Sequence, residues 1–385
     1  MSAMLKKIKS IKKILPIPVN LKFIKAMILL SFSLINTRIF NIKTKRGPLF
    51  ITWLVTFDCN LYCSFCSTHK SKKKHSANLS THRAREVAHE IGKSNVFIVG
   101  FTGGEVFLWP QLFEIITILK EYGVIVYIVT NGLLLSKYVD EIIVTKVDFV
   151  IVSIDSDKEE EHDYMRKNTG LSKKIVNGIN SLKSERGNSG PLIKSTTVLS
   201  KRNLNRINET LENLETLVDV SSLQPIVGEY SDHPHGKSEE SLKKFLYGQH
   251  EEEFVRKEIS RLVEKDKKFQ NKYFKFIPDY WFDRGKLIKK IRCWSPFLRL
   301  QILPDGNTHH CNVNPEFASN AVGNIKNNSL LEIWNSSEMM RQREIIRNHK
   351  NNCICWTQDT AFNAILDGVP LLDKLPVFNK KMKSN

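Results

Sequence analysis

Short apolar runs alternate with longer amphipathic segments through the middle of this 385-residue chain. The runs are rich in Val, Ile and Phe and have the length of strands, whereas the segments between them repeat apolar residues every three or four positions, as helices do. We expect six strands with a helix between each pair, the strands at residues 49–56, 95–101, 124–129, 149–154, 192–199 and 223–227 and the helices at 81–91, 111–122, 133–144, 171–185 and 205–217. This order is typical of parallel βαβ units with right-handed crossovers, and six units make a partial α/β barrel. Functional groups in such folds gather at the carboxyl ends of the strands.

Three cysteines follow the first predicted strand directly, at Cys59, Cys63 and Cys66. Three thiolates on one loop can hold three corners of a four-iron cluster and leave the fourth iron open to another ligand. Zinc is the alternative, with His69 as a fourth ligand, although zinc loops usually begin with a Cys-x2-Cys pair. A disulfide framework does not fit, because seven cysteines in 385 residues are sparse and odd in number.

The Cys-x3-Cys-x2-Cys spacing, with the aromatic Phe65 before the last cysteine, resembles the radical S-adenosylmethionine (SAM) superfamily. Gly103-Gly104-Glu105 follows the second predicted strand, where that superfamily binds the ammonium group of SAM, although such a sequence is also a common turn. Ser153-Ile154-Asp155, followed by a stretch that ends in Arg166, resembles a further segment of peptide- and small-molecule-modifying members. Here Ser156 stands where the family usually has glycine.

The resemblance implies a TIM-like partial (β/α)6 barrel and a set of site residues. Cys59, Cys63 and Cys66 would hold the catalytic [4Fe-4S] cluster with its open iron site. The residues that would bind SAM are Phe65, Gly103, Gly104, Glu105, Asn131, Ser153, Arg166 and Gln224. Other interpretations remain for two of them, since Arg166 also suits an exposed helix and Gln224 an ordinary strand end.

The other four cysteines, Cys293, Cys311, Cys353 and Cys355, lie beyond the barrel. Cys293 and Cys311 frame a β-rich segment with the turn Pro304-Asp305-Gly306, which resembles the opening of the SPASM or twitch extension of radical SAM enzymes. This resemblance implies a small C-terminal β-hairpin and helix module that holds an auxiliary [4Fe-4S] cluster, and four ligands favour the shorter twitch form. Zinc is the alternative here as well.

The charge of the chain is concentrated at its N-terminus. The net charge is +18, and the first 57 residues hold nine Lys, two Arg and no acidic residue. Lysines alternate with apolar residues there, and the apolar run 26–35 is too short to span a bilayer. We expect residues 1–46 to contact a membrane surface, with packing across the base of the barrel as the alternative. Aromatic residues are not interleaved with these lysines, so we do not expect a nucleic-acid partner.

We therefore expect five regions. They are a basic amphipathic segment (1–48), the barrel (49–237), a helical cover (238–290), the auxiliary cluster module (291–360) and a basic tail (361–385). The resemblance implies an enzyme that cleaves SAM to a 5′-deoxyadenosyl radical, abstracts hydrogen from a substrate, and takes electrons from a donor such as flavodoxin or ferredoxin. The substrate alternatives are a ribosomal peptide, a sugar or cyclitol, and a membrane lipid, and a metal-binding scaffold is the non-enzymatic alternative. Iron–sulfur clusters need reduced thiolates, so we expect a cytoplasmic protein, peripheral at the membrane if residues 1–46 bind there.

Overall fold

A computed structural model describes residues 43–66, 78–187, 190–226, 243–265, 272–288, 293–311 and 321–348. The chain divides into two compact units. One contains residues 45–248 and 299–339, and the other contains 1–44, 249–298 and 340–385. We call the first the barrel unit and describe each by itself.

The barrel unit is built on one nine-stranded sheet in the order β6-β5-β4-β3-β2-β1-β7-β8-β9. Neighbouring strands from β6 to β7 are parallel, while β8 and β9 are antiparallel to their neighbours. The strands are β1 (Phe50–Thr56), β2 (Ile98–Gly103), β3 (Ile125–Thr130), β4 (Phe149–Ser153), β5 (Leu192–Leu199), β6 (Val220–Pro225), β7 (Arg299–Ile302), β8 (Asn307–His309) and β9 (Gly323–Asn324). Within the described ranges no pairing joins the two edge strands β6 and β9, so the predicted partial, open barrel is confirmed.

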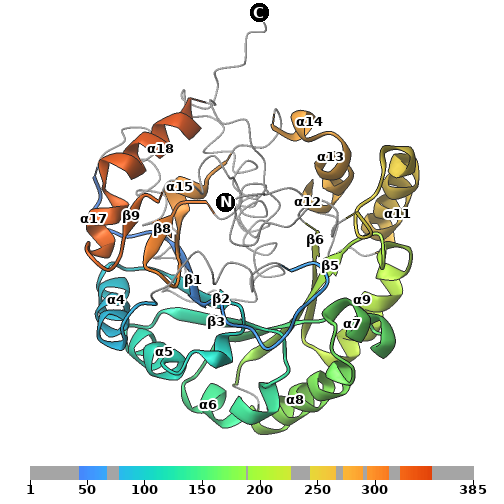
Figure 1. Cartoon of the computed structure of the whole chain (residues 1–385), viewed down its shortest axis with the longest axis horizontal. Helices are drawn as coiled ribbons and strands as arrows, with labels where there is room; N and C mark the ends of the chain where they lie inside the picture. Colours follow the sequence, from blue (N-terminus) through green and yellow to red (C-terminus); the bar gives the residue numbers. More distant parts are fainter. Residues whose placement is uncertain are drawn as a thin grey trace, which may run out of the picture. The chain divides into compact units, whose positions relative to one another are not determined.

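The helices of the barrel unit follow the strands in turn. They lie along the outside of the curved sheet from β1 to β6 (Figure 1). The main ones are α4 (Thr81–Lys93), α5 (Leu112–Glu121), α6 (Val139–Val144), α7 (Glu159–Arg166), α8 (Leu171–Glu185) and α9 (Ile207–Leu217). Ser80 caps the first of these helices, because its side chain accepts a hydrogen bond from the amide of Arg83 at 3.2 Å.

One face of the sheet packs on these helices and the other stays partly accessible. In β3, β5 and β6 buried and half-buried residues alternate strictly along the strand. The buried set of β5, which includes Ile193 and Leu199, faces the helices. The alternate set therefore lies on the opposite, inner face.

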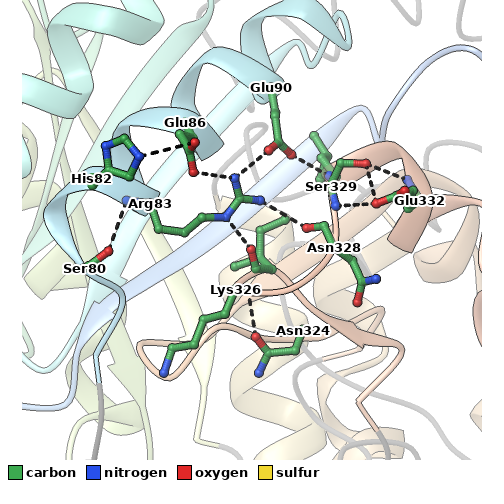
Figure 2. Close-up of polar contacts among 12 residues, drawn as sticks. Ser80, His82, Arg83, Glu86, Glu90, Asn324, Lys326, Asn328, Ser329 and Glu332 are labelled. Carbon is green, nitrogen blue, oxygen red and sulfur yellow. Dashed lines mark hydrogen bonds and ion pairs between the residues drawn. The ribbon is translucent and has the colours of Figure 1, made fainter.

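The hairpin β7–β8 is not a separate small sheet, because β7 pairs with β1 and extends the barrel sheet. A group of polar contacts, which we call the Arg83 cluster, fixes the segment after β9 to α4 (Figure 2). The Arg83 guanidinium donates to the carbonyls of Ile325 at 2.7 Å and Asn328 at 3.1 Å, and it pairs with Glu90 at 2.8 Å. Glu90 in turn accepts the amide of Leu330, the first residue of α17 (Leu330–Trp334), at 2.7 Å.

The second unit is helical in its described part, and the covering role of residues 238–290 stays a prediction. It contains α11 (Glu252–Lys265), α12 (Lys272–Lys275), α13 (Ile277–Phe282), α14 (Arg284–Ile288) and α15 (Ser295–Leu298), while α18 (Ser337–Arg347) runs from the barrel unit into it. None of the helices in the described ranges is both long and apolar enough to cross a membrane. Most of the N-terminal segment 1–46, with its predicted membrane contact, lies outside the described residues.

Candidate functional site

The three-cysteine loop leaves the carboxyl end of β1 and is tied down by its own backbone. The amide of Cys66 donates to the carbonyl of Cys63 at 3.1 Å, which forms a tight turn between these two residues. The amide of Ser64 donates to the carbonyl of Met165 on α7 at 2.9 Å. Cys63 is buried, and Cys59 and Cys66 are half-buried. The loop is thus held from two sides, by β1 and by α7.

Gly103 and Gly104 lie directly against the base of this loop. The amide of Gly104 donates to the Thr56 carbonyl at 2.7 Å, and the amide of Glu105 donates to the Asp58 carbonyl at 2.8 Å. A Cβ atom on Gly104 would lie 2.0 Å from the Asp58 carbonyl oxygen, and Gly103 has φ of +143°. The structure therefore requires both glycines for the close approach of two backbones and a positive φ.

The Glu105 carboxylate is fully buried and points to the end of the neighbouring strand β3. One oxygen accepts the Thr130 hydroxyl at 2.7 Å, and the other accepts the amide of Asn131 at 2.8 Å. Burial raises the pKa of Glu105 to about 7, although these two donors and the amide of Phe107 oppose the rise. Glu105 consequently joins the end of β2 to the end of β3.

Asn131 continues this connection to the cysteine loop. Its side-chain amide donates to the Asn60 side chain at 2.8 Å and lies 3.8 Å from the sulfur of Cys59. The side-chain oxygen of Asn131 accepts the backbone amide of Leu133 at 2.9 Å, which fixes the orientation of the Asn131 side chain. Two predicted site residues from different strands, Glu105 and Asn131, are thereby brought together with Cys59.

Arg166 reaches the same loop from α7. Its side chain is only 8% exposed, so it is not the exposed helix residue of the alternative interpretation. Its guanidinium donates to the Asp155 carboxylate at 2.7 Å, lies 4.0 Å from the sulfur of Cys63, and stacks over the Phe65 ring at 5.0 Å. Arg166 therefore contacts both Cys63 and Phe65 of the cysteine loop.

The remaining predicted SAM contacts lie at the ends of the next strands. Ser153 ends β4 opposite Thr196, and Gln224 lies opposite Val198 near the end of β6. Ser156, where the family usually has glycine, fits without a left-handed backbone, because its φ is not positive. Its hydroxyl accepts the amide of Lys158 at 3.1 Å and donates to Glu161. The departure at Ser156 therefore leaves the loop intact.

The chemistry of the loop fits an iron–sulfur cluster. Burial raises the pKa of the Cys59 thiol to about 11 and that of Cys63 as well, although Arg166 opposes the rise at Cys63. An N–H donor from Asn131 and a cation from Arg166 face the two sulfurs, as is common around cluster thiolates. In the described ranges no three His, Cys, Asp or Glu side chains converge on a point where they could hold a single metal ion. His69, the zinc alternative, lies outside them.

The auxiliary cysteines are described only in part. Cys311 is buried, two residues after β8 in the barrel unit, and Cys293 is half-buried at the start of the segment that leads to α15 in the other unit. Cys353 and Cys355 lie outside the described residues. The auxiliary cluster site therefore remains a prediction.

Two buried residues to which the sequence assigned no role complete the site, Thr130 and Asp155, the second of them part of the Ser153-Ile154-Asp155 motif. Thr130 connects Glu105 to Gly132, because its hydroxyl donates to the Glu105 carboxylate and accepts the amide of Gly132 at 3.0 Å. Asp155 joins Arg166 to β5, where its second oxygen accepts the Val198 amide at 3.1 Å. Both are polar residues at the carboxyl end of a strand, which is the signal that could have identified them.

Comparison with family models finds two matches. The model described as the radical SAM superfamily matches residues 53–214, and one described as an iron–sulfur cluster-binding domain, SPASM, matches residues 293–357. The first range contains the cysteine loop and all the predicted SAM-binding residues except Gln224. The second contains all four auxiliary cysteines.

Similar proteins were also found among curated sequences and solved structures. The AdoMet-dependent heme synthase of Methanosarcina barkeri is 32% identical over 172 residues, which cover 44% of this chain and 48% of that protein. The antilisterial bacteriocin subtilosin biosynthesis protein AlbA of Bacillus subtilis is 25% identical over 296 residues, which cover 75% of this chain and 60% of AlbA. The crystal structure of Streptococcus suis SuiB bound to precursor peptide SuiA superposes with a TM-score of 0.59 at 14% sequence identity. The superposition covers 81% of this chain and 69% of SuiB, and it supports the fold. The chain spans about half the length of the first curated relatives that it matches.

Proposed function

The chain belongs to the radical SAM superfamily and carries a SPASM iron–sulfur cluster-binding domain, and we propose that it cleaves SAM reductively to remove hydrogen from a peptide. The observation that carries this proposal is the junction at the carboxyl ends of β1 to β4. There the cysteine loop contacts Asn131 on one side and Arg166 on the other. Both contacts come from residues far apart in the sequence, so the fold itself assembles them around the thiols.

Cys59, Cys63 and Cys66 are the residues that would hold the cluster, with SAM on its open iron. A cluster held by these residues would provide the electron for reductive cleavage of SAM and so the means to abstract hydrogen from the substrate. The pKa values of the Cys59 and Cys63 thiols are raised, so cluster binding has to release protons from these two cysteines. The nearby guanidinium of Arg166 favours the thiolate form of Cys63.

The other residues of the site would orient SAM and keep water out. Glu105 and Asn131 hold the ends of β2 and β3 against the loop. The half-buried backbone of the Gly103-Gly104 turn would receive the ammonium group, and Ser153 and Gln224 on the inner face would meet the ribose and adenine. Because the carboxylate of Glu105 is already bound by Thr130 and Asn131, we assign it to positioning this turn.

Peptide substrates are favoured by two of the similar proteins. AlbA is named for the biosynthesis of the bacteriocin subtilosin, and SuiB was crystallised with a precursor peptide. The AlbA match extends over 75% of this chain and so reaches beyond the barrel alone. The electron donor and the membrane contact of residues 1–46 stay predictions, and we also predict that the auxiliary cluster transfers an electron.

The test of SAM cleavage is anaerobic reconstitution with iron and sulfide, followed by dithionite and SAM. We expect 5′-deoxyadenosine from the wild-type protein and less than about 1% of that yield from Cys63→Ala, since a missing cluster ligand removes the cofactor. Ser64→Ala, a change on the same loop at a residue that contributes only its backbone, should keep the yield. Equal yields from wild type and Cys63→Ala would refute the proposed function.

The test of the substrate class uses deuterium transfer. The enzyme is incubated with a tryptic digest of uniformly deuterated cell protein, with deuterated small metabolites, or with vesicles of deuterated lipids. We expect deuterium in 5′-deoxyadenosine from the peptide sample only. Transfer from the metabolites or the lipids instead would replace the peptide with one of the other substrate classes.

A further inference from the structure

Lys194 is a lysine in the middle of a buried strand of the barrel. Its neighbours Ile193 and Ser195 are fully buried and face the helices, so Lys194 lies on the inner face of the sheet. The described structure gives it no hydrogen bond and no ion pair, and it belongs to the strictly alternating half-buried set of β5. A charged side chain thus faces the side of the sheet on which SAM and substrate would bind.

Its immediate neighbours on the sheet cannot balance the charge. Lys194 lies between Ile151 of β4 and Val220 of β6, and Val129 of β3 is the next residue in the same row. Removal of the ammonium from water lowers its pKa to about 8, and among the residues that the structure describes no partner group offsets this effect. An ammonium among apolar neighbours destabilises a fold, so a purely structural role does not account for it.

A polar row lies two residues further toward the carboxyl end of the strands. Ser153, Thr196 and Ser222 are consecutive partners across β4, β5 and β6, and the hydroxyls of Thr196 and Ser222 are 3.1 Å apart. Two residues along a strand correspond to roughly 7 Å, about the length of a lysine side chain. Ser153 is one of the residues assigned to SAM above. Lys194 is therefore in the row adjacent to the SAM-binding end of the barrel.

We propose that Lys194 is the anion-binding residue of a substrate subsite on the inner face of the sheet, and that the peptide presents a carboxylate to it. The proposal rests on the proposed function, because it places the subsite beside SAM. A carboxylate would supply the charge and the hydrogen-bond acceptors that the sheet does not provide. The Thr196 hydroxyl would donate to the same group, whereas the Ser222 hydroxyl donates to the Ser195 carbonyl at 2.8 Å.

The test measures binding of three probes to the reconstituted enzyme with SAM bound. They are N-acetylglutamate amide, its matched control N-acetylglutamine amide, and N-acetylalanine, which carries only a terminal carboxylate. We expect wild type to bind one of the carboxylate probes about 30-fold or more tighter than the glutamine probe, and Lys194→Met to lose this preference. Binding of N-acetylglutamate amide would show that the subsite takes an acidic side chain, and binding of N-acetylalanine would show that it takes a peptide C-terminus. Equal binding of all three probes, or no measurable binding of any, overturns the proposal.

Two further measurements keep the result unambiguous. Lys194→Met should unfold at a higher temperature than wild type, because it removes a lone ammonium from apolar surroundings. A lower unfolding temperature would reveal a structural partner and contradict the proposal. Loss of 5′-deoxyadenosine release from SAM in the variant, measured without any probe, would instead place Lys194 on SAM and contradict the proposal. If wild type releases no 5′-deoxyadenosine, the proposed function fails, while preference for a carboxylate probe would still report the subsite.

Discussion

The Arg83 cluster offers a direct test of how the region after β9 is held to the barrel. We consider Arg83→Met, which removes the guanidinium and keeps the apolar stem. In the structure this guanidinium satisfies two backbone carbonyls, at Ile325 and Asn328, and pairs with Glu90 (Figure 2). The Arg83 side chain is only 18% exposed, so water replaces few of these contacts.

The expected loss follows from these contacts. Hydrogen bonds from a charged donor contribute about 1.5–3 kcal/mol each, and a partly buried carboxylate without its partner adds a penalty. Water reaches Glu90, whose side chain is 25% exposed, and this reduces the penalty. We therefore expect Arg83→Met to lower the free energy of unfolding by about 3 kcal/mol, which for a unit of this size corresponds to a fall in Tm of about 6–10 °C.

The matched control is Arg85→Met on the same helix. Arg85 forms an ion pair with Glu114, but both side chains are largely exposed, at 48% and 42%, and exposed pairs contribute little. Anaerobic calorimetry compares the Tm values, and hydrogen–deuterium exchange follows the peptide that covers residues 323–334. We expect faster exchange of this peptide in Arg83→Met only. Similar Tm values for the two variants, or unchanged exchange of 323–334 in Arg83→Met, would refute the reasoning.

Three other changes test the site itself. Gly104→Ala should abolish cluster incorporation, measured as iron per protein, since its Cβ would lie 2.0 Å from the Asp58 carbonyl; wild-type iron content would contradict this. Arg166→Met should lower the free energy of unfolding, measured by chemical denaturation, by about 3–5 kcal/mol, because it leaves the charge of Asp155 buried without its ion-pair partner. Adding Asp155→Asn should recover part of that loss. No recovery in the double variant would argue against the ion pair. Burial lowers the pKa of His162 to about 4, so the unfolded chain binds a proton that the folded chain does not, and stability is lost as pH falls through the range from about 6.5 to 4. The loss between pH 7 and 5.5 should be about 1 kcal/mol larger for wild type than for His162→Gln, and parallel pH curves would exclude this effect.

The sequence predicted the order of elements well, because hydrophobic periodicity reports burial directly. The predicted strand 192–199 and helix 171–185 coincide with β5 and α8. The helix expected at 133–144 begins instead with a 3-10 turn at Leu135–Tyr138 and becomes α-helical at Val139. Positions at strand ends could also be predicted, since consecutive strands of a parallel sheet end at one edge.

The contacts between these ends could not be read from the sequence. An exposed helix was one of two interpretations of Arg166, and whether the side chain faces solvent or Asp155 depends on the packing of α7 against the sheet. The pairing of β7 with β1 was also not predicted, because the strand pattern identifies strands and not their partners. Lys194 was missed for a related reason, since a single lysine in an apolar strand gives no periodic signal.

The pairing of β7 with β1 has a consequence for biosynthesis. Arg299 on β7 donates to Thr52 on β1, and the two residues lie 247 positions apart in the chain. While the ribosome is still making the intervening residues, the outer edge of β1 has exposed amides and carbonyls with no neighbouring strand. A nascent chain released early would keep that bare edge and be prone to self-association, so late arrival of β7 distinguishes finished chains from prematurely terminated ones.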